Sequence, residues 1–148
     1  MANGSLVVVK PKTKWHNRKM HTIIVTAAII QRAEKILIAQ RKGTADHGLK
    51  WEFPGGKLHF GEDPRAGLKR EIQEELDMEI EVGPIFEVVS HLYGERHILL
   101  LCYTCRYLGS QPSTKDCQDF RWVTPQEMRD FDFTEADLPV VEKLQAYP

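Results

Sequence analysis

The stretch Trp51–Met78, WEFPGGKLHFGEDPRAGLKREIQEELDM, decides the fold because a tight turn is followed by a helix with two different faces. Asp63 is well suited to cap the start of that helix, and Pro64 falls at its first position, where a missing N–H costs nothing. The apolar residues recur every fourth position: Leu68, Ile72 and Leu76. This spacing predicts a helix that begins at Pro64, ends near Leu76 and packs on a hydrophobic core.

A second face of the same helix carries three carboxylates. Glu71, Glu74 and Glu75 stand at positions i, i+3 and i+4, so their side chains lie close together on the helix surface. Such a set is often only a solvated face, but three like charges this close repel each other unless a cation lies between them. Hard oxygen ligands suit Mg²⁺ or Mn²⁺. Ahead of the helix, the Pro-Gly-Gly run at 54–56 lets the backbone turn and approach whatever the glutamates bind.

The spacing of these residues resembles the signature of the Nudix hydrolases. That signature is Gly, five residues, Glu, seven residues, Arg-Glu, an aliphatic residue, any residue, Glu-Glu, any residue, Gly and an aliphatic residue. The corresponding positions here begin at Gly56, continue with Glu62 and run from Arg70 to Leu76. One position differs, because Asp77 stands where the family has glycine. An aspartate in the left-handed conformation at a helix end costs on the order of 1 kcal/mol and removes no ligand, so we expect an intact site.

Apolar, β-branched segments on either side of this stretch predict strands. They cover residues 23–30, 36–41, 80–93, 97–108 and 119–123, and a turn at 31–35 joins the first two as a hairpin. Thr124 and Thr134 are placed to begin two further helices, the last of which runs through Leu144. Strands mixed with helices indicate an α/β fold, and the resemblance implies a Nudix-type α/β/α sandwich with a mixed β-sheet between helices.

A chain of 148 residues is long enough for one domain with a substantial core. We expect a Nudix hydrolase domain at 21–148, preceded by an N-terminal extension at 1–20. The extension holds a short apolar run at 5–9 and several basic residues. It is interpreted as a partly ordered tail, with an interface strand or a lid as the alternative.

The overall charge excludes one class of partner. A formal net charge of −1 is not the basic excess of proteins that bind nucleic-acid polymers, whereas a single nucleotide needs only a few local cations. No apolar run approaches the length of a membrane span, and no signal peptide is evident. Three cysteines, an odd number, suit the reducing cytoplasm. Cys102 and Cys105 form a CxxC, but they point to opposite faces of a predicted strand, which predicts buried structural cysteines rather than a metal site.

Within the Nudix family, residues 22–144 are similar to the MutT-type and CTP-pyrophosphohydrolase-type enzymes, which act on nucleoside triphosphates. The resemblance implies that Phe53 contacts the base and that Lys57 belongs to the same substrate-binding segment. It also implies that Arg41 binds a substrate phosphate and that Arg96 lies against the base. From the sequence alone, each arginine is equally well an exposed residue at a strand end.

Two later acids extend this resemblance. Asp116 lies where related enzymes supply a further metal ligand from a loop, although the nearby Asp119 is an alternative. Asp137 lies in a segment that reads the base in related enzymes, which carry asparagine or aspartate there. An ordinary charge at a helix N-terminus would also explain Asp137.

The resemblance implies an Mg²⁺-dependent hydrolysis, with Mn²⁺ as an alternative ion, that converts a nucleoside triphosphate to the monophosphate and pyrophosphate. The expected metal ligands are Gly56, through its carbonyl, Glu71, Glu74, Glu75 and Asp116. The expected catalytic residues are Arg70, Glu71, Glu74 and Glu75, with Glu71 as ligand or base. Arg70 would pair with Glu74 one turn on, and Glu62 would fix the loop before the helix.

The substrate is left open between an oxidised purine such as 8-oxo-dGTP and a CTP- or dCTP-type pyrimidine. A hydrolase of ADP-ribose or another nucleoside diphosphate derivative is a second hypothesis, although family enzymes of that kind tend to carry a proline past the motif and residues 90–94 (SHLYG) have none. A non-catalytic, nucleotide-sensing module is a third, and it is disfavoured because every glutamate of the motif is present. The expected partner is a small-molecule nucleotide, and the expected assembly is a monomer or a homodimer.

Overall fold

The computed structural model describes residues 20–146, so the predicted N-terminal extension lies, except for its last residue, outside the described residues. Within that range, seven strands form one sheet in the order β3-β2-β1-β6-β5, with β4 paired to β1 and β7 paired to β2. The strands are β1 (His21–Arg32), β2 (Lys35–Gln40), β3 (Trp51–Glu52), β4 (Gly55–Lys57), β5 (Ile80–Tyr93), β6 (Arg96–Tyr107) and β7 (Asp119–Val123). The sheet is mixed, because β1 and β6 are parallel and the other pairs are antiparallel.

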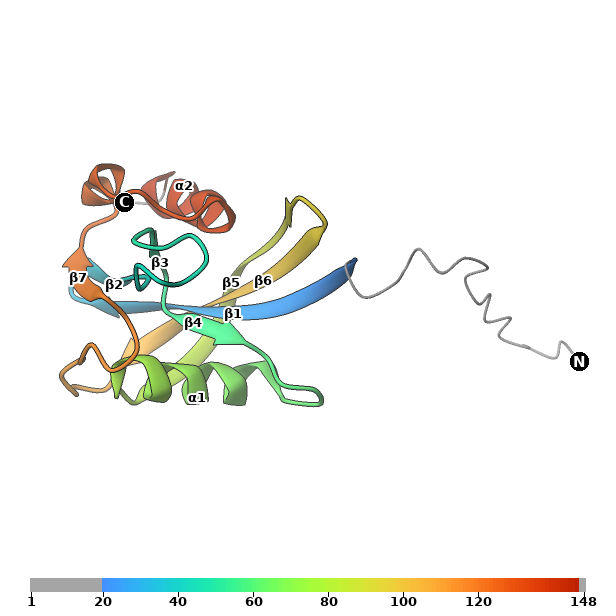
Figure 1. Cartoon of the computed structure of the whole chain (residues 1–148). Helices are drawn as coiled ribbons and strands as arrows, with labels where there is room; N and C mark the ends of the chain where they lie inside the picture. Colours follow the sequence, from blue (N-terminus) through green and yellow to red (C-terminus); the bar gives the residue numbers. More distant parts are fainter. Residues whose placement is uncertain (1–19, 147–148) are drawn as a thin grey trace, which may run out of the picture.

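Helices cover both faces of the sheet. α1 (Pro64–Leu76) lies on one face and α2 (Leu138–Ala146) on the other, and the short 3-10 helices η2 (Gln126–Asp130) and η3 (Glu135–Asp137) precede α2. Figure 1 shows the strands between α1 below and α2 above. The predicted α/β/α sandwich with a mixed sheet is therefore confirmed. No helix within residues 20–146 is long and apolar enough to cross a membrane.

The hydrophobic core is divided by the second half of β1, where residues 26–30 are buried on both faces. The buried strand predicted from residue 23 onward is therefore confirmed only in this half, because Ile24 is 41% exposed. On one side, Ala28 and Ile30 pack with the apolar stripe of α1, which is Leu68, Ile72 and Leu76. On the other, Ala27 and Ile29 pack with the apolar residues of α2, which are Val140, Val141 and Leu144. Because successive residues of a strand point to opposite faces, one buried strand joins both helices to the same sheet.

The two CxxC cysteines are separated by this division of the core. Cys102 belongs to the cluster on the α2 side, and Cys105 belongs to the cluster on the α1 side. Both thiols are buried and neither forms a disulfide. The prediction of structural cysteines on opposite faces of a strand is confirmed.

Both ends of α1 follow the prediction. Asp63 caps the start, because its carboxylate accepts hydrogen bonds from the backbone N–H groups of Arg65 and Ala66 at 2.9 and 3.2 Å. At the other end, Asp77 is left-handed with φ 54°, and its N–H donates to the carbonyl of Gln73 at 3.1 Å. The aspartate therefore ends the helix in the way that the family's glycine was expected to do.

Two predicted elements differ from the structure. The turn predicted at 31–35 is tighter, because β1 continues through Arg32 and β2 already begins at Lys35. The helix predicted after Thr124 is only the 3-10 helix Gln126–Asp130, although the reciprocal hydrogen bonds between Thr124 and Glu127 do form at 3.0 and 3.2 Å. It ends early because the chain becomes extended at Phe131 and then runs beside Trp51 of β3.

Candidate active site

The glycine turn brings β4 against the carboxylate face of α1. Gly55 and Gly56 pair with Ala27 and Thr26 of β1, which fixes the turn to the centre of the sheet. A Cβ atom at position 56 would overlap the carboxylate of Glu71. A side chain at position 56 would therefore displace the Glu71 carboxylate from its place beside the turn.

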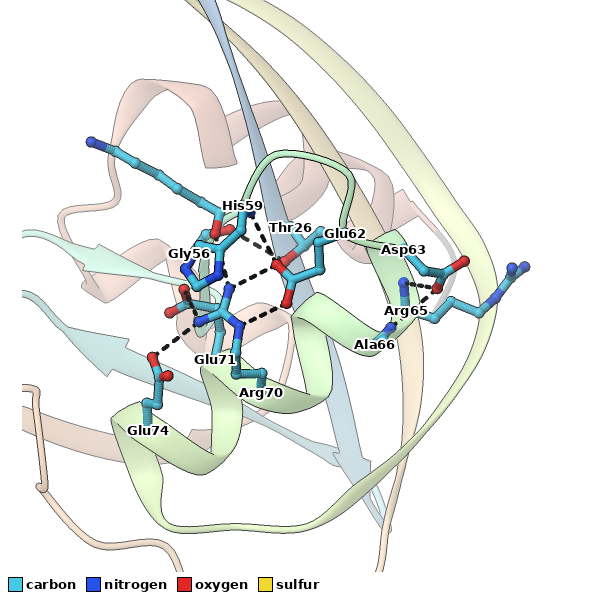
Figure 2. Close-up of polar contacts among 11 residues, drawn as sticks. Thr26, Gly56, His59, Glu62, Asp63, Arg65, Ala66, Arg70, Glu71 and Glu74 are labelled. Carbon is cyan, nitrogen blue, oxygen red and sulfur yellow. Dashed lines mark hydrogen bonds and ion pairs between the residues drawn. The ribbon is translucent and has the colours of Figure 1, made fainter.

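The side chain of Arg70 on α1 donates hydrogen bonds to several neighbouring groups (Figure 2). Its Nε and Nη2 donate to the two carboxylate oxygens of Glu62 at 2.8 and 2.9 Å, a bidentate pair. Its Nη1 donates to Glu71 at 3.0 Å and to Glu74 at 3.1 Å, the contact one turn on that the sequence predicted. Its Nη2 also donates to the carbonyl of Lys57 at 3.3 Å. Arg70 therefore ties the loop before the helix to two of the three glutamates.

Glu62 holds that loop from the other side. One of its carboxylate oxygens accepts the backbone N–H of His59 at 3.0 Å, as Figure 2 shows. The hydrogen bonds from Arg70, with that from His59, lower the pKa of Glu62 to about 2. Glu62 is therefore ionised and fully engaged by the protein itself.

Glu75 has the opposite environment. It is only 8% exposed, and its one hydrogen bond within residues 20–146 comes from the backbone N–H of Gly55 at 3.3 Å. Burial raises the pKa of Glu75 well above its ordinary value, and the nearby carboxylates of Glu52, Glu71 and Asp116 raise it further. The buried carboxyl group of Glu75, with those of Glu71 and Asp116 nearby, supplies the oxygen donors that a hard divalent cation prefers, so the residues present fit such an ion.

The side chains predicted to bind the metal are not gathered around one point. Among residues 20–146, no three His, Cys, Asp or Glu side chains already form a metal cage. The contacts explain this, since Arg70 holds Glu71 and Glu74 while Glu75 turns toward Gly55.

Two adjoining cavities lie beside the helix. The larger cavity has a volume of about 510 Å³, and the smaller cavity has a volume of about 230 Å³. Most of the predicted site residues line the larger one: Arg41, Phe53, Gly56, Lys57, Glu71, Arg96, Asp116 and Asp137. The smaller one is lined by Arg41, Glu71, Glu74, Glu75 and Asp116. Arg70 and Glu62 line neither cavity, so they lie behind the glutamates rather than among the groups that face a ligand.

Asp116 and Asp119, the two candidates for an additional metal ligand, have different environments in the structure. Asp116 lines both cavities, its N–H donates to the carbonyl of Glu75 at 3.0 Å, and its carboxylate pairs with Lys42 at 2.8 Å. Asp119 lines neither cavity and pairs with Arg121 at 2.9 Å. Of the two candidates for an additional ligand, only Asp116 lies at the site.

The far end of the larger cavity is formed by buried residues. Phe53 is 2% exposed, and its ring lies 5.5 Å from that of Phe133. Asp137 is 5% exposed and accepts a hydrogen bond from the hydroxyl of Thr134. Burial raises the pKa of Asp137 to about 8, so its carboxyl group holds a proton at neutral pH and both donates and accepts.

Several residues of the site were not singled out from the sequence. Glu52 lies between the two cavities and pairs with Arg41 at 3.0 Å, and burial raises its pKa. The signal for Glu52 was an acid between two aromatic residues directly before the glycine turn. The larger cavity is also lined by Asp46, His47 and Tyr93. Their positions in the sequence form no pattern that would predict that they lie together.

Comparisons with known proteins identify the family of this chain. The family model for the NUDIX domain matches residues 20–144. The chain is 35% identical over 127 residues to the CTP pyrophosphohydrolase of Escherichia coli, a match that covers 86% of this chain and 94% of that protein. It is 31% identical over 122 residues to the 8-oxo-dGTP diphosphatase of Escherichia coli, covering 82% of this chain and 95% of that protein.

A solved structure gives the same result. The solution structure of the E. coli ORF135 protein superposes with a TM-score of 0.74 at 34% identity, and the match covers 86% of this chain and 91% of that one. The match of the family model and the identity to full-length relatives establish what the motif predicted: this chain is a member of the Nudix family.

Proposed function

We propose that this protein is a metal-dependent pyrophosphohydrolase that converts a nucleoside triphosphate to its monophosphate and pyrophosphate. The observation that carries the proposal is the buried carboxyl group of Glu75, which lines the smaller cavity together with Glu71 and Asp116, two residues that also line the adjoining cavity of about 510 Å³. The names of the two relatives, a CTP pyrophosphohydrolase and an 8-oxo-dGTP diphosphatase, support the substrate class.

Family members generally use a divalent metal, and the ion proposed here is Mg²⁺, with Mn²⁺ as the alternative. The groups that would hold it are the Gly56 carbonyl and the carboxylates of Glu71, Glu74, Glu75 and Asp116. When bound, the ion supplies charge neutralisation at the phosphates and lowers the pKa of a bound water. The high cost of burying Glu75 is then offset by its contact with the cation.

The protein's own groups complete the reaction. Glu71 reaches both cavities and accepts the proton of the attacking water, while Arg70 holds Glu71 in place from behind. Arg41 lies at the junction of the cavities, where its guanidinium faces the phosphates, and Lys57 adds a second cation at the cavity wall. Glu62 fixes Arg70, so that the carboxylates keep their direction.

The base is held in the larger cavity between the buried residues Phe53 and Asp137 and the partly exposed Arg96. A protonated Asp137 donates one hydrogen bond and accepts another, which suits N3 and N4 of cytosine. The same pair of contacts also suits the edge of an oxidised guanine, so both CTP-type and 8-oxo-dGTP-type substrates agree with the pocket. The enzyme is proposed to act in the cytoplasm on small nucleotides rather than on nucleic-acid polymers, as a monomer or a homodimer.

The experiment measures pyrophosphate release from CTP, dCTP, 5-methyl-dCTP, dGTP and 8-oxo-dGTP, with and without Mg²⁺, and uses ADP-ribose as a comparison. We expect Mg²⁺-dependent release from one of the triphosphates. Glu75→Gln should reduce it by several orders of magnitude without lowering the stability of the fold, since the substitution removes a buried charge. Glu142→Gln, at an exposed position of α2, is the matched control and should have full activity.

Three results would contradict the proposal. Turnover of ADP-ribose alone would assign the protein to nucleoside diphosphate derivatives. Nucleotide binding without any turnover would indicate a sensing module. A loss of only a few-fold in Glu75→Gln would place the metal elsewhere.

A further inference from the structure

The loop of residues 42–50, between β2 and β3, forms one wall of the larger cavity. Asp46 in this loop contacts two arginines that line the same cavity. Its backbone carbonyl accepts a hydrogen bond from Nε of Arg41 at 2.6 Å, and its carboxylate pairs with Nη1 of Arg96 at 3.1 Å. One residue therefore connects a cation at the end of β2 with a cation at the start of β6.

The position of Asp46 is set by the shape of the 42–50 loop. His47 is left-handed with φ 55°, which lets two successive side chains reach the hairpin formed by β5 and β6. The His47 ring lies 4.7 Å from that of Tyr93, whose hydroxyl accepts the backbone N–H of Ala136 at 2.8 Å. A Cβ atom at Gly48 would lie 2.6 Å from the carbonyl oxygen of Gly43, so the loop is also folded closely on itself. The loop thus spans from Arg41, which directly follows β2, to Tyr93 at the wall of the cavity.

We propose that Asp46 is a positioning residue that fixes the directions of Arg41 and Arg96 before a nucleotide enters. The inference rests on the proposed function, because it gives both arginines a substrate to bind. An arginine held by a partner loses less side-chain entropy on binding than a mobile one. Arg96 depends on Asp46 in particular, since its side chain is 42% exposed, whereas Arg41 is also held by Glu52 at 3.0 Å.

Replacing the side chain of Asp46 should affect its contact with Arg96 but not its contact with Arg41. Asp46→Ala keeps the backbone carbonyl that holds Arg41 and removes only the carboxylate that holds Arg96. Because Arg96 lies at the base end, away from the phosphates, its loss of order should weaken binding rather than chemistry. An exposed ion pair contributes up to about 1 kcal/mol, which corresponds to about a fivefold change. We expect Asp46→Ala to raise KM about three- to fivefold with kcat unchanged.

The matched control is Asp132→Ala. Asp132 pairs with Lys50 at 3.3 Å at the end of the same loop, and its side chain is 77% exposed, against 76% for Asp46. Asp132 and Lys50 line neither cavity. This variant removes an equivalent surface ion pair without touching Arg96, so we expect its KM to equal that of the unmutated protein.

The experiment is a double-mutant cycle with Asp46→Ala, Arg96→Ala and the double variant. KM and kcat are measured for CTP and 8-oxo-dGTP, and the affinities for CMP and 8-oxo-dGMP are measured by calorimetry. The proposal predicts that Asp46→Ala has no further effect when Arg96 is already alanine, and that Asp46→Glu recovers part of the affinity. Additive effects of the two substitutions, or an equal effect of Asp132→Ala, would show that Asp46 only stabilises the loop.

A fall in KM on Asp46→Ala would also overturn the proposal, because it would mean that the carboxylate competes with the substrate for Arg96. If the unmutated protein releases no pyrophosphate from any triphosphate, the proposed function fails. The monophosphate affinities then still report whether Asp46 acts through Arg96.

Discussion

Asp137 allows a quantitative test of the buried end of the cavity. Its carboxyl group is 5% exposed, and burial raises its pKa from 3.8 to about 8. Asp137→Asn replaces it with a group of the same shape that does not titrate. The Asn side chain keeps an oxygen that accepts the hydroxyl hydrogen of Thr134, which is a partner of Asp137 in the structure.

The pH dependence follows from the direction of this shift. Between pH 4 and pH 8 the carboxyl group is ionised in the unfolded chain and protonated in the folded one, so the folded state binds one more proton. The free energy of unfolding therefore falls by about 1.4 kcal/mol for each pH unit. From pH 5 to pH 8 the free energy of unfolding therefore falls by about 4 kcal/mol because of Asp137 alone. Asp137→Asn should remove this fall, since the amide does not titrate.

The assay is urea unfolding of both proteins at pH 5, 6, 7 and 8. We expect the stability advantage of Asp137→Asn over the unmutated protein to be about 4 kcal/mol larger at pH 8 than at pH 5. Asp130→Asn, at an exposed position of η2, is the control and should show no such increase. A difference between Asp137→Asn and the unmutated protein that stays constant from pH 5 to pH 8 would refute the reasoning.

Three further predictions concern other parts of the site and the core. Gly56→Ala should lower pyrophosphate release at least about a hundredfold with an unchanged circular dichroism spectrum, because a Cβ atom there overlaps Glu71. Asp77→Gly should change the free energy of unfolding by less than about 1 kcal/mol in urea and leave turnover unchanged, since relief of the left-handed aspartate is offset by a more flexible unfolded chain. Burial raises the pKa values of Cys105 and Cys117 to about 12, so a thiol reagent such as DTNB should label them only in urea.

The parts of the fold that the sequence predicts correctly are those that depend on neighbouring residues. Asp63 caps α1 through backbone groups two and three positions away, and the left-handed Asp77 closes a hydrogen bond to Gln73. The apolar stripe of the helix and the burial of residues 26–30 of β1 on both faces follow in the same way from spacing. Local chemistry and periodicity are enough for such features.

The parts that the sequence does not predict depend on where loops run. Asp46 is far in sequence from Arg96, and only the fold of the 42–50 loop brings their charges to 3.1 Å. The choice between Asp116 and Asp119 is similar, because both are acids near β7 and only the path of the chain takes Asp116 to Glu75. Burial is also a property of the assembled structure, so the raised pKa of Asp137 has no counterpart in sequence spacing.

The environments of the carboxylates separate two roles that the motif alone does not distinguish. Glu62 and Glu75 are both fixed positions of the Nudix signature, yet Arg70 and His59 satisfy Glu62 and lower its pKa to about 2. Glu75 is buried with a single N–H donor, and its pKa is raised. A carboxylate that the protein has already satisfied gains little from a cation, whereas one buried without a positive partner gains most. The free energy of metal binding should therefore depend on Glu75 more strongly than on Glu62, and metal affinity measured for Glu75→Gln and Glu62→Gln would test that order directly.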